Sequence, residues 1–189
     1  MQAGTQLVGG PRSLHRVFLA FTTDSATRAR LDALAGECHG YSGGRRVAAG
    51  KLHLTLLFIG QAREAQIEAI AGLAEARPAP GVVLSIDRLG FFERGGIVWA
   101  GCSQTPPALL DWVTDLHDRA RRTGFSVERR PFESHITLLR NARRRPQNRV
   151  EPIPWRLERL SLYESRLSAA GSEYLELRTW PTINSGDVK

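Results

Sequence analysis

The sequence predicts an α+β fold with two pseudo-symmetric lobes and a cleft between them. Two observations carry this prediction. Apolar runs with strand character and segments with helical periodicity follow one another in a mixed order. Two short stretches, residues 52–57 (LHLTLL) and 134–139 (SHITLL), are near copies that fall at corresponding places in the two halves. Because the expected strands interleave, we expect one domain over residues 14–181, between a flexible leader at 1–13 and a flexible tail at 182–189.

Three segments carry helix signals. A helix is expected over 25–37, with Asp24 or Ser25 as its N-cap, because a short polar side chain there can accept a backbone hydrogen bond. A second helix is expected over 64–76, where apolar residues repeat at helical spacing. The third, over 106–123, opens with a Pro-Pro pair and carries a row of apolar residues on one face.

The remaining apolar runs predict strands. Two of them, 81–89 and 96–101, form a hairpin-like pair in this interpretation, with the Gly95-Gly96 pair as its turn. The other expected strands, in chain order, are 15–21, 52–59, 133–139, 155–163 and 172–179.

The two near copies each place a His and a Thr two residues apart. Side chains alternate between the faces of a strand, so His53 and Thr55 project together while the leucines enter a core. His135 and Thr137 repeat this arrangement. With 5 His and 11 Thr in the chain, random order would give only about 0.3 His-x-Thr triplets. One copy alone is more simply a histidine satisfied within a half-buried strand, but two matched copies predict a pocket with two imidazoles and two hydroxyls.

This set of side chains suits acid and base chemistry at a phosphate. Imidazole titrates near neutrality, so one His of a pair can accept a proton while the other donates one. Threonine hydroxyls are neutral donors for the oxygens of a tetrahedral anion. The chain contains no ligand spacing typical of zinc, no Gly-Lys-Ser/Thr phosphate loop and no Gly-x-Ser-x-Gly turn. We therefore predict in-line displacement at phosphorus with neither a metal nor a cofactor.

Around these motifs the chain resembles the 2H phosphoesterases, and among them the LigT-like RNA 2′,3′-cyclic phosphodiesterases. The resemblance runs over about residues 15–180. It rests on these segments: HRVFLAF at 15–21, RRV at 45–47, LHLTLLFIG at 52–60, RPFESHITLLR at 130–140 and LYESRL at 162–167. Ser134, Arg46 and residues 48–51 depart from the family pattern without removing a catalytic group. The resemblance implies lobes of antiparallel sheet with outer helices, and a cleft lined by the two His-x-Thr strands.

The family activity implied for this chain is hydrolysis of a terminal RNA 2′,3′-cyclic phosphate to a 2′-phosphate, with 2′-5′ RNA ligation as the reverse reaction. The resemblance assigns His53 as proton donor and His135 as proton acceptor, a choice that the symmetry of the motifs leaves open. Thr55 and Thr137 would bind the non-bridging oxygens, with Arg140 assisting. On an unbroken strand Arg140 would face away from His135, so it needs a strand end or a bulge to reach the phosphate.

Arginine supplies most of the positive charge. The chain has 26 basic and 19 acidic residues, a net charge of +7, and Lys occurs only at positions 51 and 189. A basic surface suits a polyanion such as RNA, although scattered charges often form only a solvated face. Arginines cluster on both sides of the second motif, and we expect Arg130 to contact substrate phosphates. Phe132 and Tyr163 are candidates to line the pocket, although aromatic residues on strands are usually core.

Cysteine usage and hydropathy indicate the compartment. Cys38 and Cys102 stand alone, as expected for free thiols in a reducing compartment, and no stretch resembles a signal peptide or could span a bilayer. We therefore expect a cytoplasmic monomer, with no membrane contact, whose partner is RNA with a cyclic phosphate end. Two alternatives stay open: a phosphodiesterase for a small cyclic nucleotide such as ADP-ribose 1″,2″-cyclic phosphate, and a non-catalytic RNA- or nucleotide-binding module.

Overall fold

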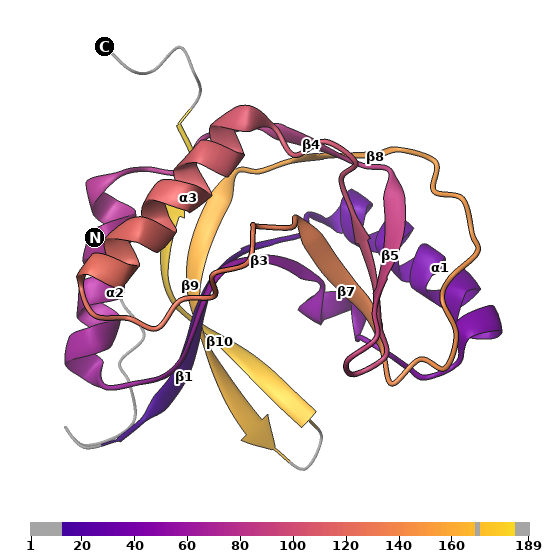
Figure 1. Ribbon diagram of the computed structural model, residues 1–189, viewed down its shortest axis with the longest axis horizontal. Coiled ribbons are helices and arrows are strands. Elements are labelled where there is room, and N and C mark those ends of the chain that lie inside the picture. The colour runs from indigo at the N-terminus through magenta and orange to yellow at the C-terminus, as the bar shows by residue number, and fades with distance from the viewer. Residues whose placement is uncertain (1–12, 169–170, 184–189) are drawn as a thin grey trace.

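The computed structural model describes residues 13–168 and 171–183, in which strands and helices follow one another in a mixed order (Figure 1). The helices are α1 (Ser25–Ser42), α2 (Glu64–Ala76) and α3 (Pro107–Arg122), with a short 3₁₀ turn, η1 (Ala49–Lys51). The strands are β1 (His15–Thr22), β2 (Arg45–Arg46), β3 (His53–Ala62), β4 (Val83–Ile86), β5 (Arg88–Phe92), β6 (Ile97–Gly101), β7 (His135–Arg140), β8 (Ile153–Arg156), β9 (Arg159–Ser168) and β10 (Gly171–Pro181). The predicted α+β class is confirmed.

One large antiparallel sheet carries both motif strands. Its strand order is β10-β9-β1-β3-β7-β6-β5, and β2 pairs with β7 beside this path, while β4 and β8 form a separate two-stranded sheet. The motif strands β3 and β7 are central neighbours, but they pair at a single position, Leu54 with Ile136. The sheet therefore has two halves, β10-β9-β1-β3 and β7-β6-β5, that are joined only where the two motifs meet.

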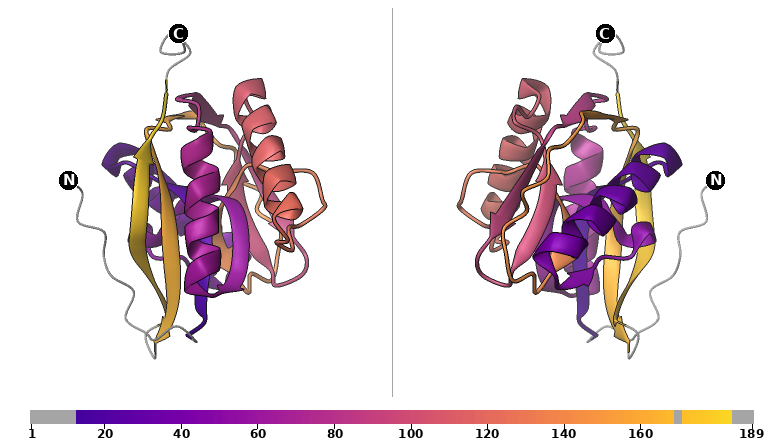
Figure 2. Two further views of the ribbon diagram at one scale, coloured as in Figure 1. Left: turned by 90° about the vertical axis from the view of Figure 1, so that its left-hand side faces the viewer. Right: turned by 90° about the vertical axis from the view of Figure 1, so that its right-hand side faces the viewer.

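The helices tie the two halves together. The helix that follows β1, α1, packs on β7 of the other half, on β2 beside it and on β8, whereas α3, which follows β6, packs on β3. The third helix, α2, contacts α3 and β10. In Figure 2, α2 and α3 are at the front of the left view and α1 is at the front of the right view. Each half is thus covered by a helix from the other half of the chain, as the interleaving expected from the sequence requires.

The core is continuous beneath both halves of the sheet. The apolar side chains that alternate with the motif residues, such as Leu54 and Ile136, belong to the same buried cluster as Trp112 of α3 and Trp155 of β8. Burying this much apolar surface is the main stabilising contribution to a fold of this size. The motif strands therefore present their polar face to the cleft because their other face is fixed in the core.

One helix boundary in the first half differs from the prediction. Helix α1 begins as predicted, with Asp24 as N-cap accepting from the Thr27 amide at 2.9 Å, but it continues past Glu37 to Ser42. The reason is burial: Cys38 and Ser42 lie on the buried face of the helix, and the chain leaves it only at Gly43, where φ is +65°.

The predicted pairing of strand 81–89 with strand 96–101 is wrong in part. The segment is divided at Asp87, so that β5 alone forms the hairpin with β6, while β4 pairs with β8. Asp87 accepts a hydrogen bond from the Ser103 amide at 2.6 Å, which takes this residue out of the strand. The turn at Gly95 and Gly96 is confirmed, since both have positive φ angles, +87° and +52°. The single strand predicted over 155–163 is likewise two strands, β8 and β9.

Backbone hydrogen bonds continue past Pro181 at the C-terminal side. The Thr182 amide donates to the Glu158 carbonyl, and the Ile183 amide donates to the Ala79 carbonyl, each at 2.9 Å. The bonded chain therefore extends at least two residues into the predicted tail. The predicted leader up to residue 12, and the tail from residue 184, lie outside the described residues. None of the described helices is long and apolar enough to cross a membrane.

Candidate active site

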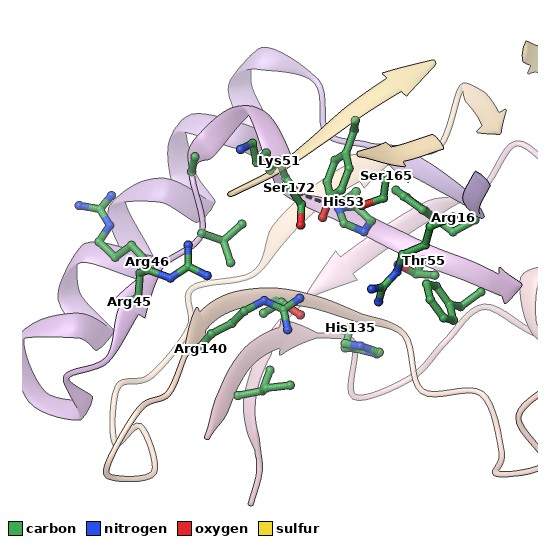
Figure 3. A pocket seen from close by; sticks show the side chains of 17 residues that line it. Arg16, Arg45, Arg46, Lys51, His53, Thr55, His135, Arg140, Ser165 and Ser172 are labelled. Carbon is green, nitrogen blue, oxygen red and sulfur yellow. Dashed lines mark hydrogen bonds between the residues drawn. The ribbon is translucent and has the colours of Figure 1, made fainter. Parts of the chain in front are cut away.

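A cleft of about 710 Å³ lies at the meeting point of β3 and β7 (Figure 3). Its lining includes His53, Thr55, His135, Thr137 and Arg140, so the structure brings together all five residues that the sequence predicts to take part in the reaction. The other lining residues are Arg16, Phe18, Arg45, Arg46, Val47, Ala48, Lys51, Phe58, Ile97, Ser165, Ser172 and Tyr174.

The single residue pair between the motif strands arranges the four polar side chains around one point. Because β3 and β7 run antiparallel through this pair, the start of one motif lies toward the end of the other. His53 is thereby brought toward Thr137, and Thr55 toward His135. A tetrahedral group held between the strands thus meets an imidazole and a hydroxyl from each side, which matches the two-fold arrangement expected from the repeated motif.

A β-bulge turns Arg140 into the cleft. The register of β7 with β6 shifts by one directly after Thr137, which makes Leu138 an extra residue in β7. A bulge of this kind moves the following residues to the opposite face of the strand. Arg140, five residues after His135, therefore lies on the same side as the histidine and lines the cleft. The sequence predicts that Arg140 can reach the phosphate only from a strand end or after a bulge, and the structure has the bulge.

The other motif strand contains the same bulge. The register of β3 with β1 shifts directly after Thr55, so Leu56 is the extra residue, and its carbonyl accepts a hydrogen bond from His117 Nε2 at 2.7 Å. The residue that corresponds to Arg140 is Phe58, which lines the cleft. The cleft is therefore symmetric in its histidines and threonines, but it has a guanidinium on one side and an aromatic ring on the other.

Both imidazoles are fixed by backbone carbonyls of their own segments. His53 Nδ1 donates to the Lys51 carbonyl at 2.7 Å, and His135 Nδ1 donates to the Glu133 carbonyl at 2.8 Å. A carbonyl oxygen only accepts, so Nδ1 carries the hydrogen in each neutral ring. Nε2 is then the atom of each imidazole that can take up a proton in the cleft.

Aromatic rings flank both imidazoles. The ring centroid of His53 lies 5.1 Å from that of Phe18 and 5.2 Å from that of Tyr174. The corresponding pair beside the second histidine is Phe92, at 5.2 Å, and Trp99, at 6.1 Å. These rings limit the orientations of the imidazoles and take up space that water would otherwise occupy.

Burial lowers the pKa of both catalytic candidates. For His53 the loss of hydration is the largest cause, the bond to the Lys51 carbonyl opposes it, and the nearby charges of Arg140 and His135 lower the pKa further. For His135 burial again comes first, the carbonyl and carboxylate of Glu133 raise the pKa, and Arg140 lowers it. Both imidazoles are therefore biased toward the neutral form in the free protein, and a bound anion would favour protonation.

The family follows from the chain as a whole. Residues 23–168, which include all three helices and both motif strands, match the 2′-5′ RNA ligase superfamily. The chain belongs to this superfamily. The resemblance that the motifs indicated is thereby confirmed.

Members of this superfamily with known names and structures agree with that assignment. The chain is 34% identical over 139 residues to the RNA 2′,3′-cyclic phosphodiesterase of Escherichia coli K12, covering 72% of this chain and 79% of the relative. It is 28% identical over 136 residues to the protein of that name from Archaeoglobus fulgidus, covering 70% and 76%. The crystal structure of E. coli LigT complexed with 3′-AMP has a TM-score of 0.81 at 30% identity, covering 90% of this chain and 99% of LigT. For the apo form the values are 0.79, 30%, 89% and 98%.

Three residues proposed from the sequence as substrate contacts do not line the cleft of this superfamily member. Arg130 is exposed and forms an ion pair with Glu128 at 2.9 Å, two residues away in the chain. Phe132 packs against the core. Tyr163 is buried behind Phe18, with ring centroids 5.5 Å apart, so it supports a ring that contacts His53 without reaching the cleft itself. Within the described residues, no group of three or more His, Cys, Asp or Glu side chains lies together as a metal site would require.

Several lining residues were not predicted from the sequence. Arg16 comes from β1 and Tyr174 from β10, strands that reach the site only because the sheet orders them beside β3. Phe58 had a usable signal, because it stands five residues after the first motif His as Arg140 stands after the second. Arg45 and Lys51 precede the first motif in the chain. Nothing in the sequence of this flanking segment indicates that they line the cleft.

Replacing Arg140 with Gln should raise the pKa of both motif histidines in the free protein. Arg140 lowers the pKa of His53 and of His135, so removing its charge favours imidazolium in both rings. The measurement is an NMR titration of the imidazole Cε1 protons, with Arg46→Gln as the matched control because Arg46 is paired with Asp32 at 2.6 Å. If Arg140→Gln left both titrations unchanged while Arg46→Gln moved them, Arg140 would not be the charge that lowers these pKa values.

Proposed function

We propose that this protein hydrolyses the terminal 2′,3′-cyclic phosphate of RNA to a 2′-phosphate. The observation that carries the proposal is the cleft itself: two imidazoles of the same tautomer and the two threonine hydroxyls of the motifs line it where β3 and β7 pair. The proposal is supported by the superfamily and by relatives named RNA 2′,3′-cyclic phosphodiesterase. The protein is accordingly an enzyme of the hydrolase class.

In the proposed reaction a water oxygen attacks phosphorus as the bond between phosphorus and the 3′ oxygen breaks. His135 Nε2 takes a proton from the attacking water, and the imidazolium of His53 gives a proton to the departing 3′ oxygen. The products are a 2′-phosphate and a 3′-hydroxyl. The carboxylate of Glu133 favours the imidazolium that His135 becomes in this step, and the choice of His135 as base is the one that the family resemblance implies. If a 5′-hydroxyl takes the place of the attacking water, the same groups act in the same roles: His135 takes the hydroxyl proton, His53 protonates the departing 3′ oxygen, and a 2′-5′ linkage forms.

The remaining groups bind the phosphate. The hydroxyls of Thr55 and Thr137 enter the cleft from opposite strands and are suited to donate to the two non-bridging oxygens. Arg140 adds a planar guanidinium, whose donors match two phosphate oxygens at once. As negative charge on these oxygens grows during attack, fixed donors of this kind stabilise the transition state more than the ground state.

The test is incubation of a short RNA ending in a 2′,3′-cyclic phosphate with the protein in excess EDTA, followed by identification of the product against 2′- and 3′-phosphate standards. We expect only the 2′-phosphate. A 3′-phosphate would contradict the direction of bond cleavage. RNA that binds without turnover would favour the non-catalytic module, whereas turnover of ADP-ribose 1″,2″-cyclic phosphate alone would favour the small-nucleotide alternative.

We also propose that the enzyme acts as a monomer in the cytoplasm. Both cysteines are free and buried, which suits a reducing compartment, and burial raises the pKa of the Cys38 thiol to about 11. The side chains to which the proposed reaction is assigned all belong to one chain, so the proposed step needs no group from a second copy. Size-exclusion chromatography with light scattering tests the monomer.

A further inference from the structure

The cleft carries more positive charge than a single cyclic phosphate needs. Four cationic side chains, Arg16, Arg45, Lys51 and Arg140, line it and have no carboxylate partner within residues 13–168 and 171–183. None of the 17 lining residues in the described part of the chain is Asp or Glu. A cyclic phosphate diester carries one negative charge, so the cleft is arranged for a ligand with more than one anionic group.

Two of these cations lie directly opposite each other on neighbouring strands. β2 pairs with β7 so that Arg45 faces Arg140, and residues paired in this way project to the same face. Like charges directly opposite are destabilising in a sheet. Since Arg140 faces the cleft, Arg45 does too, and Figure 3 shows both on the same side of the two histidines, away from Arg16. An anion bound between them would relieve this repulsion.

The backbone holds β2 in this place. The Val47 amide donates to the Leu138 carbonyl at 2.8 Å, and the Arg143 amide donates to the Ser42 carbonyl at 2.9 Å. Gly44 has φ of +86°, and a Cβ there would lie 2.6 Å from the Arg140 carbonyl oxygen. The close approach of the two strands, and with it the pairing of Arg45 with Arg140, is therefore built into the backbone.

The neighbouring arginine provides the contrast. Arg46 pairs with Leu139, one position further along β2, and although it also lines the cleft, its guanidinium is held on α1. Its guanidinium is bound by the carboxylate of Asp32 on α1 at 2.6 Å and by the Asp32 carbonyl at 3.0 Å. Two adjacent arginines thus differ in their ion pairing, because Arg46 has an acidic partner and Arg45 has none among the described residues.

We propose that Arg45, together with Arg140, binds a second phosphate of the substrate, the one on the 5′ oxygen of the ribose that carries the cyclic phosphate. The proposal rests on the proposed function, because it takes the reacting phosphate to lie between the two motifs. In RNA this second phosphate is the internucleotide phosphate, which is the anionic group nearest to the terminal cyclic phosphate. The same position carries the pyrophosphate in ADP-ribose 1″,2″-cyclic phosphate, so both substrate classes share this group.

The first arm of the test is kinetic. Adenosine 2′,3′-cyclic phosphate is compared with the same compound bearing a 5′-phosphate, using wild type, Arg45→Gln and Arg46→Gln. We expect the 5′-phosphate to raise kcat/KM of the wild type and of Arg46→Gln by about tenfold, the scale of one charge-assisted contact. Arg45→Gln should lose this preference while retaining turnover of the compound without a 5′-phosphate. Equal loss of the preference in both variants, or no preference in the wild type, would overturn the proposal.

The second arm measures binding without turnover and so separates the two proposals. Calorimetry compares adenosine 2′-phosphate with adenosine 2′,5′-bisphosphate on the same three proteins. A preference for the bisphosphate that depends on Arg45 and not on Arg46 supports the second-phosphate site even if no cyclic phosphate is hydrolysed, in which case the proposed function alone fails. If the bisphosphate binds no more tightly than the monophosphate, the site is refuted even where hydrolysis occurs.

A last comparison identifies the source of the second phosphate. With the site established, kcat/KM is measured for a dinucleotide ending in a 2′,3′-cyclic phosphate and for ADP-ribose 1″,2″-cyclic phosphate. A higher Arg45-dependent value for the dinucleotide assigns the site to RNA, and a higher value for the ADP-ribose derivative assigns it to the pyrophosphate compound.

Discussion

Replacement of His53 or His135 by Gln is expected to lower kcat for the cyclic phosphate by about 10²–10⁴-fold, the usual contribution of a positioned acid or base. Each imidazole presents Nε2 to the cleft because its Nδ1 is bonded to a backbone carbonyl. Glutamine keeps a polar group of similar size but cannot transfer a proton near neutral pH. The measurement is single-turnover hydrolysis of an RNA ending in a 2′,3′-cyclic phosphate, with affinity for the 2′-phosphate product determined separately.

The double variant gives the sharper result. If the two histidines act in one step as acid and base, removing the second adds little once the first is gone, so the double variant should be nearly as active as the weaker single variant. His39→Gln is the control, because His39 is exposed in the last turn of α1 and lies outside the cleft. Product affinity that survives in both single variants would show that the cleft still folds. Losses that simply multiply would contradict a concerted role.

Those features of the fold that depend on the spacing of apolar residues within one segment could be predicted from the sequence. The alternation of His53 and Thr55 with buried leucines fixed the face of β3, and helical spacing predicted the observed bounds of α2. Which strand pairs with which depends on residues far apart in the sequence. The segment around Asp87 has strand character on both sides, and nothing within it states that β4 pairs with β8, more than sixty residues away. Such pairings are decided by how the whole chain fills its core.

The site shows the same division. The repeated motif is visible in the sequence as a duplication, whereas strand alternation alone puts Arg140 on the face away from His135. The bulge at Leu138 reverses this placement, but a run of leucines gives no sign of where an extra residue sits. Clustering of arginines along the chain also does not tell which have acidic partners, as the ion pair of Arg130 with Glu128 shows.

Substitution of Gly101 by Ala is expected to destabilise the protein by about 1–3 kcal/mol, the range for forcing an extra methyl group into a packed site. Gly101 pairs with His135 across β6 and β7. An added Cβ would overlap the Ser134 carbonyl oxygen and lie 2.9 Å from the Trp99 indole, the ring that packs beside His135. Thermal unfolding should show a Tm lower by about 2–4 °C for each kcal/mol lost.

The rate should fall by more than the stability loss explains. The methyl group would push on the residue before His135 and on Trp99, so the imidazole must shift, and a displacement of about 1 Å at a reacting group can cost about 10²-fold in rate. Gly72→Ala in α2 is the matched control, since no atom lies within 4 Å of its added Cβ. Alanine there should stabilise the helix by about 0.5–1 kcal/mol and leave the rate unchanged. A Gly101→Ala variant with normal stability and normal kcat would show that β6 does not position His135.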